Sequence, residues 1–270
     1  MSATRGRRRT IEDQLGRQVT FRYPPRRIVC LCPSLTETLF ALGAGPRVVG
    51  RTVYCVHPPA GVVTVPTVGG TKNVDIPALL ELRPDLVIAA QEENRRPDVE
   101  KLAERVAVYV VDVRGVPDAL GVIQTLGDLT DCTGPAANLV ERISERFTCL
   151  RRAADQRVAY LVWREPYMAA GRETYIDALL RQIGLQNAAG NRPERYPRLS
   201  PAELRALAPE AVLLSSEPYP FDETHCAELA AIVPNARLLL VDGELLGWYG
   251  ARMLAAGDYL DDLVGRLEGC

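Results

Sequence analysis

The feature that most constrains the fold of this chain is an internal repeat. Residues 79–92 read LLELRPDLVIAAQE, and residues 204–217 read LRALAPEAVLLSSE. Each copy combines a helix end, a proline, an acidic residue and an apolar run that predicts a buried strand, followed by a glutamate. Glu92 and Glu217 therefore follow equivalent strands, at the end where open α/β sheets bind ligands. Two such halves facing one another predict a two-lobed binding protein with a cleft.

The sequence around both copies has the alternation of an α/β protein. In the first half, apolar β-branched runs alternate with amphipathic stretches, which indicates a mainly parallel sheet with crossover helices. Ser34 and Glu37 predict an N-cap and a capping box for the first helix. We expect strands at 19–23, 27–32, 48–53, 86–90 and 107–112, with helices at 34–43, 76–83 and 97–106.

The remaining sequence predicts a helical connection and a second α/β region. Residues 117–155 carry no strand signal and predict a helix that breaks near 131–135 and resumes through Arg152, a stiff spine between lobes. Beyond it we expect strands at 158–163, 211–216 and 237–241, with helices at 174–183, 201–208, 223–232 and 246–267, the second of these capped by Ser200 and Glu203. The predicted organisation is an N-terminal lobe over 1–116, a spine over 117–155 and a C-terminal lobe over 156–270.

Composition excludes several classes of protein. The chain is 47% hydrophobic with a net charge of -2, which argues against disorder and against nucleic-acid binding as its main activity. Seven cysteines at irregular spacing are a poor disulfide framework and agree with a reducing compartment. No apolar stretch follows the basic N-terminus that could act as a signal peptide or membrane span. We therefore expect a cytoplasmic protein whose N-terminal tail is frayed and solvated at Arg5, Arg7, Arg8 and Arg9.

Aromatic and basic residues gather in the loops that follow the predicted strands. Trp163, Tyr167 and Trp248 would suit a large, flat, partly apolar ligand, whereas a single aromatic residue can simply cover the end of a sheet. Lys72, in a glycine turn, and Arg164 could contact acidic or amide edges of such a ligand. The absence of a GxSxG motif and the presence of two histidines leave little for catalysis, so we expect a binding protein rather than an enzyme.

A direct metal site is an alternative. Cys55 and His57 are two residues apart, and thiolate and imidazole groups suit zinc, iron or cobalt when a carboxylate completes the shell. The spacing matches no standard zinc pattern, and a packed thiol beside a surface imidazole would give the same sequence. This alternative would use Cys55, His57, Glu217 and His225. A third class, an enzyme that handles a corrinoid, would change its ligand chemically.

Several stretches together resemble a known family. They are RIVCLCPSLTE at 27–37, VGGTKN at 68–73 with PDLVI at 84–88, and WREPYMAAG at 163–171. In type and order they are similar to the solute-binding proteins of ABC importers for cobalamin and iron–siderophore complexes, the helical-backbone metal receptors. SSEPYPF at 215–221 and VDGELLGWYG at 241–250 look like the branch labelled cobalamin-binding.

The resemblance implies two Rossmann-like lobes joined by a long spanning helix, the class III architecture, with no catalysis and no required cofactor. It implies that Tyr54, Tyr196 and Asp242 contact the ligand, a cobalamin, another corrinoid or an iron chelate. The tryptophan that cobalamin binders place near the glycine turn is replaced by Gly69 and Gly70. The full predicted ligand-binding set is Tyr54, Lys72, Trp163, Arg164, Tyr167, Tyr196, Asp242 and Trp248.

The resemblance also implies a transporter partner. Family members dock to a permease through one surface glutamate in each lobe, at the first turn of equivalent helices. Those places hold Pro77 and Ala202 here, with Asp75 and Glu203 nearby as possible substitutes. We therefore expect a monomer that binds a small metal chelate, with a permease partner only if the neighbouring acids serve.

Overall fold

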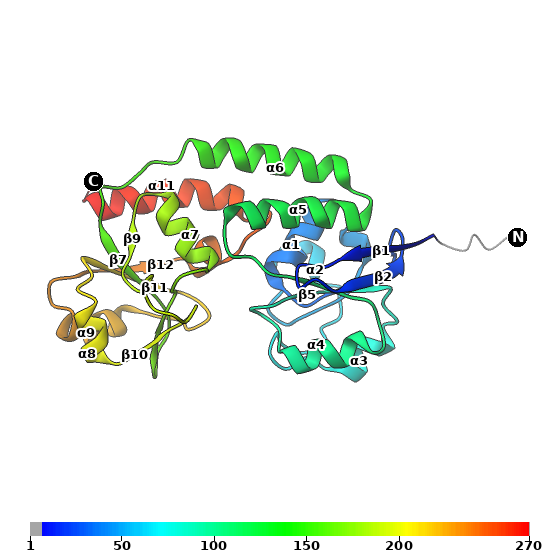
Figure 1. The fold of residues 1–270 in the computed structure, drawn as a ribbon, viewed down its shortest axis with the longest axis horizontal. Helices are drawn as coiled ribbons and strands as arrows, with labels where there is room; N and C mark the ends of the chain where they lie inside the picture. Colours follow the sequence, from blue (N-terminus) through cyan, green and yellow to red (C-terminus); the bar gives the residue numbers. More distant parts are fainter. Residues whose placement is uncertain (1–6, 270) are drawn as a thin grey trace, which may run out of the picture. The chain divides into compact units, whose positions relative to one another are not determined.

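The computed structural model describes residues 7–269 and divides into two compact units (Figure 1). Unit 1 comprises Met1–Asp112, Asp118–Arg142 and Tyr249–Ala251, and unit 2 comprises the rest. The helical connection consists of α5 (Val116–Thr130) and α6 (Thr133–Thr148). The predicted break falls between these two helices, but the second one ends at Thr148 and not at Arg152. The residues of α6 are divided between the two units, since those up to Arg142 belong to unit 1 and those from Ile143 belong to unit 2.

Unit 1 is built on a parallel sheet of four strands in the order β4-β3-β5-β6. Its strands are almost entirely buried, because helices cover both faces. In Figure 1, α3 and α4 lie on one side of the sheet and α1 and α5 on the other. The bounds are β3 (Ile28–Cys30), β4 (Val48–Arg51), β5 (Leu86–Ala90), β6 (Val108–Val111), α1 (Pro33–Ala41), η1 (Gly45–Arg47), α2 (Pro59–Val62), α3 (Ile76–Glu81) and α4 (Arg96–Ala103).

Unit 2 contains a mixed sheet in the order β10-β8-β7-β11-β12, with β9 also paired to β7. The central strands β7, β11 and β12 are parallel, and β8 and β10 are antiparallel additions at one edge. The strands are β7 (Arg157–Trp163), β8 (Tyr167–Ala169), β9 (Gln186–Asn187), β10 (Arg198–Leu199), β11 (Ala211–Ser215) and β12 (Arg237–Val241). The helices are α7 (Tyr175–Gln182), α8 (Pro201–Ala206), α9 (Glu223–Ile232), α10 (Gly243–Gly247) and α11 (Met253–Glu268).

The N-terminal region is a β-hairpin, in which the strand expected at 19–23 is confirmed as the second strand and the first strand was not predicted. Strands β1 (Arg8–Glu12) and β2 (Gln18–Arg22) pair in antiparallel register, and Val19 and Phe21 of β2 are buried. The expected frayed tail is therefore wrong for Arg8 and Arg9, and the expectation for Arg5 lies outside the described residues. The inward positions of β1 are Arg9 and Ile11, and Arg9 hid the alternation because its long apolar stem packs while its charge stays in water.

Two helix boundaries also differ from expectation. Helix α1 begins at Pro33 with Cys32 as its N-cap, so Ser34 lies inside the first turn and the predicted capping box is wrong. Proline favours the first helical position because it needs no backbone donor there. The predicted box of Ser200 and Glu203 on α8 is confirmed in both hydrogen bonds.

The expected last helix is interrupted. Helices α10 and α11 are separated at Gly250, whose φ of +96° is a left-handed conformation that favours glycine. A Cβ atom at this position would lie 2.1 Å from the hydroxyl oxygen of Thr38. That hydroxyl also accepts a hydrogen bond from the Ala251 N–H at 3.0 Å, so the chain is fixed against α1 within unit 1. Within residues 7–269, no helix combines the length and apolarity that crossing a bilayer requires.

Candidate functional site

In unit 1, an apolar loop follows β4 and consists of Val53, Tyr54 and Val56. All three side chains are exposed, and Tyr54 is 58% exposed. Large apolar side chains that stand together in water mark a binding surface more often than isolated ones do. The loop starts at the carboxyl end of a parallel strand, where α/β sheets place their ligand sites. Tyr54 thus lies in a loop after a strand, as expected, its contact with a ligand stays a prediction, and Val53 and Val56 are exposed apolar neighbours that the sequence did not single out.

Cys55 anchors this apolar loop from beneath. Its side chain is buried, its sulfur accepts a hydrogen bond from the Thr36 hydroxyl at 3.2 Å, and it lies 3.1 Å from the hydroxyl of Thr52. Burial raises the pKa of the Cys55 thiol, and only a thiolate is a good metal ligand. The sequence offered two interpretations of Cys55, a metal ligand and a packed thiol. These contacts favour the packed thiol.

Asn94 joins three segments at the strand ends of unit 1. Its buried side-chain amide donates to the backbone oxygens of Leu31 at 3.2 Å and Thr71 at 3.0 Å, and its oxygen accepts from the Ala90 N–H at 2.9 Å. One side chain therefore fixes the ends of β3 and β5 to the glycine turn. No local pattern identifies this role, since its partners are distant in the sequence.

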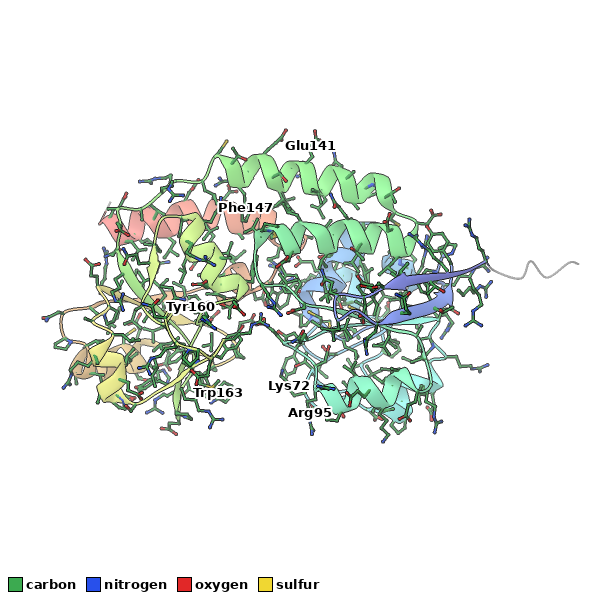
Figure 2. The ribbon with its side chains drawn as sticks, viewed as in Figure 1. Lys72, Arg95, Glu141, Phe147, Tyr160 and Trp163 are labelled. Carbon is green, nitrogen blue, oxygen red and sulfur yellow. The ribbon has the colours of Figure 1, made fainter. Side chains whose placement is uncertain are left out.

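Lys72 extends from the glycine turn beside two acidic residues. Its ammonium group donates to the backbone oxygen of Glu92, and its charge opposes the effect of burial, which raises the pKa of Glu93. Figure 2 labels Lys72 at the lower left of unit 1, next to the label of Arg95. Tyr249 also belongs to this unit and is buried, and burial followed by the charges of Cys32 and Glu93 raises its pKa. Lys72 is thus set in a locally acidic environment.

In unit 2, Trp163 is the exposed aromatic residue at the end of β7. It is 41% exposed, and Figure 2 shows it beyond the buried Tyr160 of the same strand. The Tyr219 ring packs edge-to-face against it with centroids 5.6 Å apart. Tyr219 in turn contacts Phe221 at 4.8 Å and His225 at 5.3 Å. Sequence reasoning missed Tyr219, although it lies in the SSEPYPF stretch.

Arg164 and Tyr167 share one carboxylate. The Arg164 guanidinium donates to Glu228 at 2.7 Å and to Glu165 at 2.7 Å, while the Tyr167 hydroxyl donates to the other oxygen of Glu228. These bonds, that of Tyr167 first, hold the pKa of Glu228 below its usual value. The structure thus brings two predicted site residues together, and most of their polar capacity is used within the unit.

The remaining predicted ligand contacts lie at other places in unit 2. Trp248 is only 8% exposed, its indole N–H donates to Glu217, and the Arg252 guanidinium lies 5.2 Å from its ring centre. Asp242 is the N-cap of α10 and accepts from the Leu245 N–H at 2.9 Å. Tyr196 is half-buried in the loop before β10.

The residues of the metal alternative have other partners. The Nε2 of His225 lies 2.9 Å from the Tyr219 hydroxyl, and its Nδ1 accepts from the Asp222 N–H at 3.1 Å. Glu217 accepts from Trp248. Over residues 7–269, no three histidine, cysteine or acidic side chains form a group that could hold a metal ion. A bare-ion site is therefore not favoured.

Comparison with known proteins gives a family. A model described as "Periplasmic binding protein" matches residues 28–228, which is well over half of the chain. An uncharacterized ABC transporter substrate-binding lipoprotein of Bacillus subtilis is 27% identical over 216 residues, covering 76% of this chain and 68% of that protein. A cobalamin-binding protein of Halobacterium salinarum is 28% identical over 233 residues, covering 82% and 62% respectively.

A solved structure shares the fold. A periplasmic heme-binding protein from Pseudomonas aeruginosa is 26% identical with a TM-score of 0.74, covering 90% of this chain and 92% of that one. The predicted α/β class and the resemblance to class III solute-binding proteins are thereby confirmed. These relatives are named as binding proteins or substrate-binding components, in agreement with the expectation that the chain is not an enzyme.

The same findings contradict the prediction of a cytoplasmic protein. The matched family is periplasmic, and the Bacillus relative is a lipoprotein of an ABC transporter. The prediction was wrong because it relied on a missing apolar stretch near the N-terminus, whereas the folded residues themselves carry no signal of compartment.

Proposed function

Because the chain belongs to the periplasmic binding protein family, we propose that it is the substrate-binding component of an ABC importer for a metal chelate, and that this chelate is cobalamin or another corrinoid. The observation that carries the proposal is an exposed aromatic side chain at the strand ends of each unit. Tyr54 and Trp163 are the aromatic members of the exposed large apolar residues in the described chain. Flat rings of this kind suit a planar macrocycle.

The charges beside these rings favour a corrinoid over heme. Arg164 is matched by Glu165 and Glu228, and Lys72 donates to the backbone oxygen of Glu92. Basic groups that already have acidic partners offer little to the two carboxylates of heme, because an incoming anion must compete with the existing pair. The corrin ring carries neutral amides at its edge, and these can bond to the remaining donors and acceptors. The Halobacterium relative agrees with this choice.

A permease partner follows from this role. Pro77 and Ala202 are exposed at the second positions of α3 and α8. The nearby acids have local tasks, since Asp75 accepts from the Ala78 N–H and Glu203 completes the capping box and lies 3.4 Å from Arg192. We propose that docking at these helices does not depend on either carboxylate.

A ligand panel tests the proposal. The purified protein is titrated calorimetrically with cyanocobalamin, heme and a ferric hydroxamate siderophore. We expect the tightest binding for cyanocobalamin, with an unchanged ligand spectrum after dissociation. Tighter binding of heme or of the siderophore would refute the corrinoid assignment and retain chelate binding. Failure of all three ligands to bind would refute the function, and a chemically altered ligand would indicate an enzyme.

A further inference from the structure

The N-terminal hairpin concentrates positive charge in a protein that is acidic overall. Between residues 7 and 27 the chain has seven arginines and two acids, Glu12 and Asp13, although its net charge is -2. Asp13 is buried and forms an ion pair with Arg17 at 2.6 Å, and Glu12 accepts from Gln18. The recorded partners of these two acids are thus Arg17 and Gln18.

At the open end of the hairpin two arginines oppose one another. Arg8 and Arg22 are direct cross-strand partners, and both are exposed. Side chains in such a pair have Cβ atoms about 4.5–5.5 Å apart, and like charges there repel and destabilise the strand pair. Arg7 is also exposed. It lies next to this pair, because its backbone oxygen accepts a hydrogen bond from the Tyr23 N–H at 2.7 Å. We name Arg7, Arg8 and Arg22 the arginine edge.

The described residues give the arginine edge no salt bridge. Residues 1–6 cannot supply an acidic side chain, because their sequence is MSATRG. The neighbouring Arg9 is already engaged, since it donates to the backbone oxygen of Asp128 and lies 4.9 Å from the centre of the Tyr23 ring. The Asp131 carboxylate already accepts a hydrogen bond from the Tyr23 hydroxyl at 3.3 Å. The edge thus presents more positive charge than its surroundings neutralise.

We infer that the arginine edge binds the anionic headgroups of a membrane surface. An anionic surface would relieve the repulsion between Arg8 and Arg22, because each guanidinium gains phosphate partners. A membrane is the fitting partner because an importer component acts beside a bilayer, so the choice of partner rests on the proposed function.

Vesicle co-sedimentation of the full chain tests the inference. The vesicles are pure phosphatidylcholine, or equal parts phosphatidylcholine and phosphatidylglycerol. We expect binding to the anionic vesicles only, and weakening as salt shortens the range of electrostatic attraction. Each basic residue near an anionic surface contributes about fivefold in affinity, so Arg8→Thr with Arg22→Thr should weaken binding about 30-fold.

The control keeps the change in charge and moves its place. Arg105→Thr with Arg198→Thr removes two exposed arginines, one from each unit and neither in the hairpin. This control should bind as the unmodified protein does. Equal binding by the hairpin variant, or equal binding to neutral vesicles, would overturn the inference. So would retention of a duplex DNA in preference to anionic vesicles at the same salt.

Two further readouts separate this inference from a folding defect and from the proposed function. Thr10 and Thr20 already form a threonine pair in the same sheet, so the threonine variant should fold and have a thermal midpoint at or above that of the unmodified protein. Chelate affinity should not change in the hairpin variant. A lower midpoint would show that the arginines stabilise the hairpin and would contradict the argument from repulsion. A failed ligand panel with intact vesicle binding would refute the transport role alone.

Discussion

The two units hold their exposed aromatic side chains in different ways. Tyr54 stands in a loop after β4 that is held by the Cys55 thiol beneath it and by a bond from the Val53 N–H to the Gly69 oxygen at 2.9 Å. Trp163 is part of β7 itself, and its ring is supported by Tyr219, which His225 holds in turn. A side chain held before binding loses less entropy when the ligand arrives. The comparison indicates that unit 2 supplies a preorganised aromatic contact and unit 1 an adaptable one.

The largest expected effect concerns stability and comes from Trp248. This indole is buried, bonded to Glu217 and covered by Arg252, so we treat it as a structural support and not as a wall of the site. Trp248→Ala should lower the free energy of unfolding by about 3–5 kcal/mol, which chemical denaturation can measure. Trp248→Phe retains an aromatic ring and loses the indole N–H that donates to Glu217, so it should lower the free energy of unfolding by about 1–3 kcal/mol. An alanine variant of normal stability and weakened ligand binding would reverse this assignment.

Trp163 should dominate binding. Its substitution by alanine is expected to weaken chelate affinity about 30-fold, the size typical of a large aromatic contact. Because the ring is partly exposed, the thermal midpoint should change little. Isothermal titration with the favoured ligand provides the measurement. Leu15→Ala, which removes an exposed apolar side chain in the hairpin turn, is the control and should leave affinity unchanged.

Tyr54 should contribute less than Trp163. We expect Tyr54→Ala to weaken the same affinity about fivefold, because ordering its loop offsets part of the contact. Tyr54→Phe should retain most of the affinity, since the ring and not the hydroxyl makes the contact. If the loss at Tyr54 equalled or exceeded that at Trp163, the contrast between an adaptable and a preorganised contact would be wrong.

The smallest effect should appear as a dependence of stability on pH. Hydrogen bonds and charge lower the pKa of Glu228 in the folded state. Its stabilising contribution is therefore fully present above the ordinary pKa of a glutamate, and it is lost as pH falls through the lowered value. Glu228→Gln should reduce the drop in thermal midpoint between neutral pH and about pH 3. Glu145→Gln, at an exposed position, should reproduce the unmodified curve.

Much of the fold was readable from the sequence because its strands are buried. The runs at β5 and β11 are apolar at nearly every position, and both strands are buried along their whole length. The additions at the edge of unit 2 were not predicted, because strands of two or three residues depend on distant partners and not on a local pattern. Strand β1 of the hairpin escaped prediction for a different reason, since Arg9 occupies one of its two inward positions.

The candidate site was predicted less completely than the fold. The aromatic residues Tyr54 and Trp163 could be selected from their places after strands. Arg164 directly follows β7 and bonds to Glu228 on α9. Because these two residues are far apart in the chain, no spacing rule reveals the bond. The same holds for Asn94, whose three backbone partners come from three segments.

Tyr249–Ala251 belongs to unit 1, although the rest of that unit's chain ends at Arg142. During synthesis, the strands of unit 2 therefore leave the ribosome before the last piece of unit 1 exists. A nascent chain halted ahead of Gly250 would lack the close contact of this glycine with Thr38 on α1 and the bond from the Ala251 N–H to the Thr38 hydroxyl. Unit 1 can therefore be completed only when nearly the whole polypeptide has been synthesised. If the two halves are expressed separately, the N-terminal fragment should be incompletely folded.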